Sequence, residues 1–253
     1  MLALVTGASS GFGASISKKL IENGYKVIGV ARRSDKLLEL KQSLSDNFLG
    51  LALDLCSPAN MIEEALSALE GDFNINNIDL LVNNAGLALG LELAYEANLD
   101  DWYKMIDTNI KSLVTLTRII LPTMVNNRTG LIINMGSIAG TYPYPGGNTY
   151  GASKAFVDQF SLNLRADLAG TGVRVSNVEP GLCGGTEFSV VRFKGDLDKV
   201  NTLYEDTHPL QADDIAETVY WIASQPHHIN INKIEIMPVS QSFNALKITK
   251  DQN

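Results

Sequence analysis

Tyr150, Lys154 and Ser137 have side chains that can move a proton and hold an oxygen atom that gains negative charge. Tyr150 and Lys154 are four residues apart in a segment of helical character, which places them on one helix face. A free phenol has a pKa of about 10, and an ammonium group at about 4 Å, at an effective dielectric near 20, offers about 4 kcal/mol toward ionising it. Ser137 follows an apolar strand-like run and can donate a hydrogen bond to a carbonyl oxygen. A tyrosine–lysine pair at this spacing is also common on protein surfaces, so general acid–base chemistry needs support from other motifs.

Short apolar runs alternate with longer amphipathic stretches along the chain, and this alternation predicts the elements that position these side chains. The predicted strands are residues 2–6, 26–31, 48–53, 78–82, 131–135, 173–178 and 233–237. The predicted helices are residues 10–23, 34–45, 58–69, 102–121, 149–168 and 213–224, the fourth ending at Pro122. Continuous apolar strands in β-α-β order are typical of a parallel sheet covered on both faces. We therefore predict a doubly wound α/β fold with seven parallel strands, in a single domain spanning residues 1–253.

A glycine-rich turn joins the first predicted strand to the first predicted helix. Its sequence, TGASSGFG at residues 6–13, lets the chain turn sharply and lets backbone N–H groups approach a diphosphate at the helix N-terminus. The residues expected to bind a dinucleotide here are Gly7, Ser9, Ser10, Gly11, Phe12 and Gly13. The glycines could instead serve only close packing between strand and helix.

The same turn contains a rival motif, because residues 7–11 match the G-x-S-x-G pattern of hydrolase nucleophiles. Ser9 would then need an acid and a histidine. The histidines are His208, His227 and His228, all late in the chain, and two of them follow a proline in a polar turn. Such a nucleophile also normally follows a strand in the middle of the sheet. We therefore favour the dinucleotide interpretation.

The end of the second predicted strand indicates which dinucleotide binds. An NAD site usually has an acidic residue here for the ribose hydroxyls, whereas this strand ends in Arg32 and Arg33 and the first carboxylate is Asp35. A charge-assisted hydrogen bond to phosphate contributes about 1.5–3 kcal/mol, or roughly ten- to a hundredfold in affinity. The sequence therefore predicts NADP(H), the alternative being two solvated surface arginines.

Composition and charge exclude several classes of protein. The chain has 253 residues, of which 45% are hydrophobic and 19% charged, so it is not intrinsically disordered. Its net charge of −8 argues against a nucleic-acid partner. No run reaches the ~18 apolar residues of a membrane span, and no signal peptide is expected at the start. Cys56 and Cys183 are expected to be reduced thiols in a cytoplasmic protein, and we expect no metal.

Together the motifs resemble those of the short-chain dehydrogenase/reductase family. In family order they are Thr6-Gly7-x-x-x-Gly11-x-Gly13, Asn83-Asn84-Ala85-Gly86, Asn109, Ser137, Tyr150-x-x-x-Lys154 and Pro180-Gly181, and they cover essentially the whole chain. The resemblance implies a Rossmann-type fold and a catalytic set of Asn109, Ser137, Tyr150 and Lys154. In that family the tyrosine is the general acid and base, and the lysine lowers the pKa of the tyrosine and holds the nicotinamide ribose. The serine positions the substrate carbonyl, and the asparagine holds a water in a proton relay.

The resemblance also implies cofactor contacts outside the glycine-rich turn and the two arginines. They come from Asp54, Leu55, Asn83, Ala85, Gly86, Tyr150, Lys154, Pro180, Gly181, Leu182, Gly185 and Thr186. In this family the carboxylate matching Asp54 contacts the adenine, and the segment starting at Pro180 runs along the nicotinamide. Residues 181–206 are predicted to be one long irregular region after a strand, and we expect them to form a lid over the substrate.

A narrower resemblance, to bacterial NADP-dependent 3-hydroxy acid dehydrogenases, lies in residues 83–90, 146–152, 179–189 and 191–196. Those enzymes oxidise serine, L-allo-threonine and other 3-hydroxy acids and reduce malonic semialdehyde. The resemblance implies a small-molecule substrate and a homotetramer that pairs the helices near 102–121 and 149–168.

We expect Ser137, Tyr150 and Arg192 to bind the substrate, with Arg192 rather than Lys194 meeting its carboxylate. Both cations could instead be solvated, or contact the cofactor or a neighbouring subunit. Two other functions stay open. One is a reductase of other ketones, sugars or 3-oxoacyl-carrier-protein, and the other is an NADPH-sensing protein without catalysis.

Overall fold

Seven parallel strands form one sheet in the computed structural model, which describes residues 1–243. The strands are β1 (Leu2–Thr6), β2 (Lys26–Ala31), β3 (Phe48–Ala52), β4 (Ile78–Asn83), β5 (Gly130–Met135), β6 (Val173–Pro180) and β7 (Lys233–Ile236). Their order across the sheet is β3-β2-β1-β4-β5-β6-β7, so the direction of winding reverses between β1 and β4. The predicted doubly wound, Rossmann-type α/β fold is therefore confirmed.

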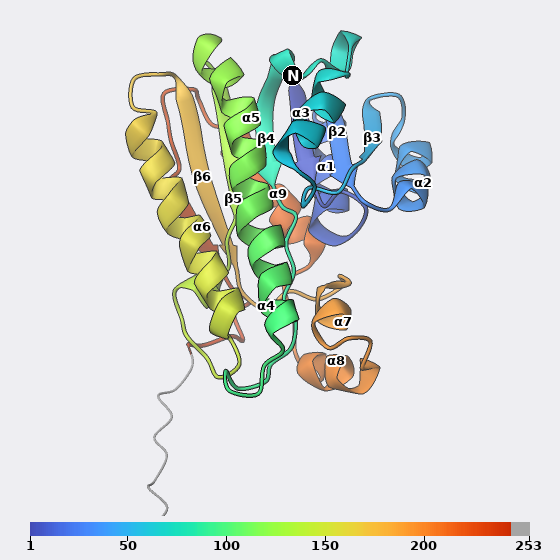
Figure 1. Ribbon diagram of the computed structural model, residues 1–253, viewed down its shortest axis with the longest axis vertical. Helices are drawn as coiled ribbons and strands as arrows, with labels where there is room; N and C mark the ends of the chain where they lie inside the picture. The colour runs from blue at the N-terminus through green and yellow to red at the C-terminus, as the bar shows by residue number, and fades with distance from the viewer. Residues whose placement is uncertain (244–253) are drawn as a thin grey trace, which may run out of the picture.

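Helices cover both faces of the sheet (Figure 1). They are α1 (Gly11–Glu22), α2 (Ser34–Leu44), α3 (Ala59–Ser67), α4 (Leu99–Ile106), α5 (Ser112–Asn126), α6 (Asn148–Asp167), α7 (Phe188–Arg192), α8 (Leu197–Tyr204) and α9 (Ala212–Ala223). Short 3-10 turns occur at Gly71–Phe73, Ile75–Asn77 and Ile138–Gly140. The side chains of successive strand residues point to opposite faces of the sheet, and each face has its own hydrophobic core. On β1, Leu4 packs with α3 and α5 on one face, while Val5 packs with α1 and α9 on the other.

The long helix predicted at residues 102–121 is two helices joined by a π-helical turn. The turn spans Asp107–Lys111, between α4 and α5. The prediction that Pro122 ends the helix was wrong, because α5 continues through it to Asn126. Proline removes the hydrogen bond to the carbonyl of Arg118, but Arg118 is exposed, so water can satisfy that carbonyl.

The predicted lid is not irregular, because residues 181–206 contain the short helices α7 and α8. Both helices lie below the carboxyl ends of the strands in the view of Figure 1. A longer stretch without helix or strand instead follows β4, over residues 84–98. Two loops thus extend from the sheet edge at which parallel sheets bind ligands.

Between Met1 and Phe243, no helix combines the length and the apolar character needed to cross a membrane. Both cysteines, Cys56 and Cys183, have free thiols.

Candidate active site

A cavity of about 720 Å³ lies at the carboxyl ends of the strands, beside the point between β1 and β4 where the sheet order reverses. The predicted site residues that line it are Gly7, Ser9, Ser10, Gly11, Phe12, Arg32, Arg33, Asp54, Leu55, Ala85, Gly86, Ser137, Tyr150, Lys154, Pro180, Gly181, Leu182, Thr186 and Arg192. Gly13, Asn83, Asn109 and Gly185 lie outside this lining. One surface therefore joins the glycine-rich turn at one end to the tyrosine and lysine at the other. The histidines required by the hydrolase alternative do not line it.

The glycine-rich turn brings the backbone of α1 against the end of β1. Gly7 has a φ of +66°, which favours glycine, and a Cβ on Gly13 would lie 2.3 Å from the carbonyl oxygen of Gly7. Helix α1 begins immediately after Ser10, whose side chain does not cap it, and its first turn has no acidic residue. The N–H groups of this helix end are therefore available to an anion.

Thr6 fixes the second loop beside this turn. Its hydroxyl accepts the backbone N–H of Asn84 at 2.9 Å and that of Ala85 at 2.8 Å, and the Asn84 amide donates to the Thr6 carbonyl at 2.8 Å. Thr6 was not among the predicted binding residues, whereas Asn84 belongs to the motif Asn83-Asn84-Ala85-Gly86 of the family resemblance. A threonine at the end of the first predicted strand, directly before the glycine-rich turn, was the available signal for Thr6.

Asn83 lies outside the cavity lining, although the family resemblance implies that this residue contacts the cofactor. Its buried side chain donates to Thr117 on α5 at 3.0 Å and to Asn134 on β5 at 2.8 Å. Strand residues alternate between faces, so Asn83, the last residue of β4, points into the core while the loop after it reaches the site. Its contacts steady the sheet behind the cavity.

Tyr150 and Lys154 are both buried on α6, one turn apart. The Lys154 ammonium donates to the Met135 carbonyl at 2.7 Å and lies 5.9 Å from the centroid of the Tyr150 ring. Burial raises the pKa of Tyr150 to about 12, against the lowering effects of the Ser137 hydroxyl and the Arg192 charge. Burial likewise lowers the pKa of Lys154 to about 8. Among the chain's own groups, Ser137 and Arg192 thus oppose the rise in the pKa of Tyr150, whereas the sequence analysis named only Lys154 for this role.

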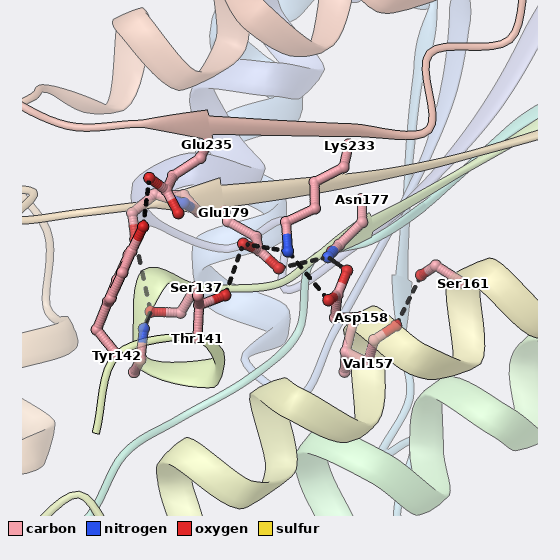
Figure 2. A network of polar contacts seen from close by, with 12 residues as sticks. Ser137, Thr141, Tyr142, Val157, Asp158, Ser161, Asn177, Glu179, Lys233 and Glu235 are labelled. Carbon is pink, nitrogen blue, oxygen red and sulfur yellow. Dashed lines mark hydrogen bonds and ion pairs between the residues drawn. The ribbon is translucent and has the colours of Figure 1, made fainter. Parts of the chain in front are cut away.

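Ser137 caps a 3-10 turn that is linked to a partly buried ionic network (Figure 2). Glu179 on β6 is fully buried, and its carboxylate is 3.0 Å from the ammonium of Lys233 on β7. Lys233 is also 3.0 Å from Asp158 on α6, the helix that carries Tyr150. Thr141, which follows the 3-10 turn, donates to Glu179 at 3.5 Å. The network therefore joins the turn of Ser137 to the helix of Tyr150.

Asn109 lies in the π-helical turn and is buried behind the cavity. Its side-chain oxygen accepts the Leu87 N–H at 2.9 Å, while its NH₂ group donates to the Leu87 carbonyl at 2.9 Å and to Ser153 at 3.0 Å. Both N–H donors of the amide are thus used within the protein. A water held at this position would have to donate to the side-chain oxygen or bind the backbone of Asn109.

The lid lies over Tyr150 and brings a cation to it. The Arg192 guanidinium carbon is 5.5 Å from the centroid of the Tyr150 ring, and its Nη2 donates to the Tyr144 hydroxyl at 2.5 Å. The Phe188 ring is 5.8 Å from that of Tyr150. Lys194 points elsewhere, pairing with Asp101 at 2.7 Å. Tyr144 and Phe188 were not predicted as site residues, although two tyrosines alternating with prolines at 142–145, just after Ser137, were a signal for Tyr144.

The sequence model of short chain dehydrogenases matches residues 1–195. The chain belongs to the short chain dehydrogenase family. A probable NADP-dependent dehydrogenase of Haemophilus influenzae is 60% identical over 250 residues, covering 99% of this chain and 98% of that protein. The NADP-dependent 3-hydroxy acid dehydrogenase YdfG of Salmonella typhi is 55% identical over 248 residues, covering 98% of this chain and 99% of that protein. The family predicted from the motifs is confirmed.

A solved structure supports the same relation for this short chain dehydrogenase. The closed form of serine dehydrogenase complexed with NADP⁺ superposes with a TM-score of 0.96 at 53% identity, covering 99% of this chain and 100% of that chain. This coverage extends beyond residue 195, to the end of the lid and β7.

The residues lining the cavity of this dehydrogenase fit a dinucleotide. At one end the uncapped start of α1 presents backbone N–H groups to a diphosphate, and Arg32 and Arg33 provide positive charge. At the other end the Lys154 ammonium has one hydrogen-bond partner among residues 1–243, the Met135 carbonyl. An ammonium has three donors, so Lys154 can also bind hydroxyl groups from the cavity.

Proposed function

We propose that this chain is an NADP(H)-dependent oxidoreductase that acts on the 3-position of small 3-hydroxy acids. The observation that carries the proposal is the position of Arg192, whose guanidinium lies 5.5 Å from the ring centroid of Tyr150. A carboxylate bound by this guanidinium places a hydroxyl or carbonyl group a few bonds away beside the phenol. The names of the relatives, an NADP-dependent 3-hydroxy acid dehydrogenase and a serine dehydrogenase, support this substrate class.

Three parts of the cavity would hold the cofactor, which when bound supplies or accepts the hydride. The glycine-rich turn and the start of α1 would bind the diphosphate, and Arg32 and Arg33 the 2′-phosphate. Asp54, Leu55 and the loop of Ala85 and Gly86 line the adenosine side. Tyr150, Lys154 and the segment from Pro180 to Thr186 line the other end.

The chain's own residues then handle the substrate oxygen. The Ser137 hydroxyl donates a hydrogen bond to it and fixes its orientation. In the direction of reduction the Tyr150 phenol donates its proton to this oxygen, and with a pKa of about 12 the phenol is protonated at neutral pH. In the direction of oxidation the phenolate accepts the proton, and the Ser137 hydroxyl and the Arg192 charge stabilise it. Lys154 and Asn109 do not exchange a proton with the substrate. They affect the orientation of the Tyr150 phenol and the electrostatic potential around it.

A substrate panel tests the proposal directly. Absorbance of the reduced cofactor is followed with malonic semialdehyde, and cofactor reduction with serine, L-allo-threonine and 3-hydroxypropionate, each with NADP(H) and NAD(H). We expect turnover of the 3-hydroxy acids, with preference for NADP(H). Faster turnover of neutral ketones, sugars or 3-oxoacyl groups would favour the sister reductase. Tight NADPH binding with no turnover of any carbonyl or alcohol would favour a sensor.

Replacing Arg192 by Ala is expected to raise KM for 3-hydroxy acids by about ten- to a hundredfold, since a hydrogen bond to a charged group contributes about 1.5–3 kcal/mol. Turnover of a small neutral ketone should change much less, because it has no carboxylate. Lys194→Ala is the matched control, since Lys194 belongs to the same lid but pairs with Asp101. An unchanged KM for 3-hydroxy acids in Arg192→Ala would contradict the carboxylate role.

We also propose a cytoplasmic homotetramer. Tyr103 and Ile106 on α4 and Phe156 and Leu162 on α6 are exposed apolar side chains on two helices that contact each other. Exposed apolar side chains on adjacent helices support association with another copy. The free cysteines support a reducing compartment.

Sedimentation of the purified protein should give a mass four times that of one chain. The double variant Ile106→Glu, Phe156→Glu is expected to shift the protein to smaller species at micromolar concentration, because it buries charge in the proposed contact. Leu38→Glu introduces a charge at an exposed leucine of α2 and should leave the assembly unchanged. A double variant that stays tetrameric would place the contact elsewhere.

A further inference from the structure

Arg33, the arginine assigned to the 2′-phosphate, already has an anionic partner within the chain. Its two terminal nitrogens donate to the two carboxylate oxygens of Glu187, at 3.1 and 2.7 Å. The same guanidinium donates to Ser9 at 3.1 Å and to Ser10 at 2.9 Å, both in the glycine-rich turn. This pair raises the pKa of Arg33 and lowers that of Glu187. Glu187 immediately precedes α7, so the contact connects the lid to the phosphate end of the cavity.

A carboxylate and a phosphate group both bind a guanidinium through two parallel N–H donors, either from Nη1 and Nη2 or from Nε and Nη2. Both arrangements need Nη2, and in Arg33 this nitrogen already donates to Glu187, Ser9 and Ser10. Glu187 lines the same cavity as Arg33, Ser9 and Ser10, so its carboxylate stands on the cavity side of the arginine. A second anion brought to this position would also meet the negative charge of Glu187.

We propose that Glu187 is a specificity-determining residue, an internal competitor for Arg33 that weakens binding of the 2′-phosphate and thereby moderates the preference for NADP(H) over NAD(H). The proposal rests on the cofactor assignment made above. When the 2′-phosphate takes the guanidinium, Glu187 must release it, and the start of α7 loses its contact with the glycine-rich turn. Cofactor binding and the position of the lid are coupled through this one arginine.

The test is a double-mutant cycle on cofactor affinity, measured without turnover from the fluorescence of bound NADPH and NADH. The proteins are the parent, Glu187→Gln, Arg33→Ala and the variant with both changes. We expect Glu187→Gln to tighten NADPH binding about two- to fivefold, the size of effect typical of an exposed ion pair. NADH affinity should not change, because NADH lacks the 2′-phosphate. The gain should disappear in the Arg33→Ala background, and it should shrink in 1 M salt.

Glu205→Gln is the control for the loss of one negative charge from the lid. Glu205 is exposed at the end of α8, and this variant should leave both affinities at the parent values. Equal or weaker NADPH binding by Glu187→Gln would overturn the proposal, and so would equal tightening of NADPH and NADH. A parent protein that binds NADH as tightly as NADPH would overturn the cofactor assignment and this inference with it. A parent that prefers NADPH and a Glu187→Gln variant without gain would overturn this inference alone.

Discussion

Replacing Tyr150 by Phe should lower kcat by about two to four orders of magnitude, the usual contribution of a positioned general acid or base. The variant keeps the ring that packs beside Phe188 and loses only the hydroxyl that exchanges a proton with the substrate. Steady-state rates in both directions, with a 3-hydroxy acid and with its 3-oxo form, measure the effect. Binding of NADPH should weaken by less than about tenfold, because one hydrogen bond to the cofactor is lost at most.

Tyr220→Phe is the matched control for this change. Tyr220 lies on α9, where the ammonium of Lys19 is 5.6 Å from the centroid of its ring, and it does not line the cavity. The Tyr220→Phe variant should therefore turn over substrate at the parent rate. A Tyr150→Phe enzyme with parent kcat would show that another group transfers the proton, and the mechanism proposed for this site would be wrong.

Replacing Lys154 by Met should abolish most activity and remove a pH-dependent cost to stability. Burial lowers the pKa of Lys154 from 10.5 to about 8 in the folded chain. Between these values the unfolded chain binds more protons than the folded one, so this lysine makes stability rise with pH. The penalty is complete below pH 8 and absent above pH 10.5, and it amounts to about 3 kcal/mol at 1.36 kcal/mol per unit.

The measurement is urea unfolding of the parent and of Lys154→Met at pH 7 and pH 10.5. The free energy of unfolding of the variant minus that of the parent should be larger at pH 7 than at pH 10.5. The difference should reach up to about 3 kcal/mol, reduced by any effect of the lost hydrogen bond to Met135. Lys18→Met, at an exposed position on α1, should show no such difference between the two pH values. A Lys154→Met variant whose stability parallels the parent at both pH values would mean that the amine is not buried as a charge.

The strands were predicted to within one or two residues at most ends, because most are continuous apolar runs, typical of parallel strands buried on both faces. Helix ends were harder. Pro122 normally stops a helix, yet the exposed position of Arg118 lets α5 continue, and exposure is a tertiary property. The π-helical turn before α5 also has no local signal, since it forms where Asn109 bonds to Leu87 in a different loop.

By itself the sequence determined the doubly wound fold, the family and the residue types at the two ends of the site. These could be predicted because the apolar runs, the glycine spacing and the tyrosine–lysine interval are patterns within short stretches of the chain. Only the tertiary structure decided what those groups contact. It turned Asn83 into the core, brought Arg192 and Tyr144 to the phenol, and paired Arg33 with Glu187. Arg33 and Glu187 are separated by 154 positions, and no local pattern reports such a contact because chain folding alone brings the loop and the lid together.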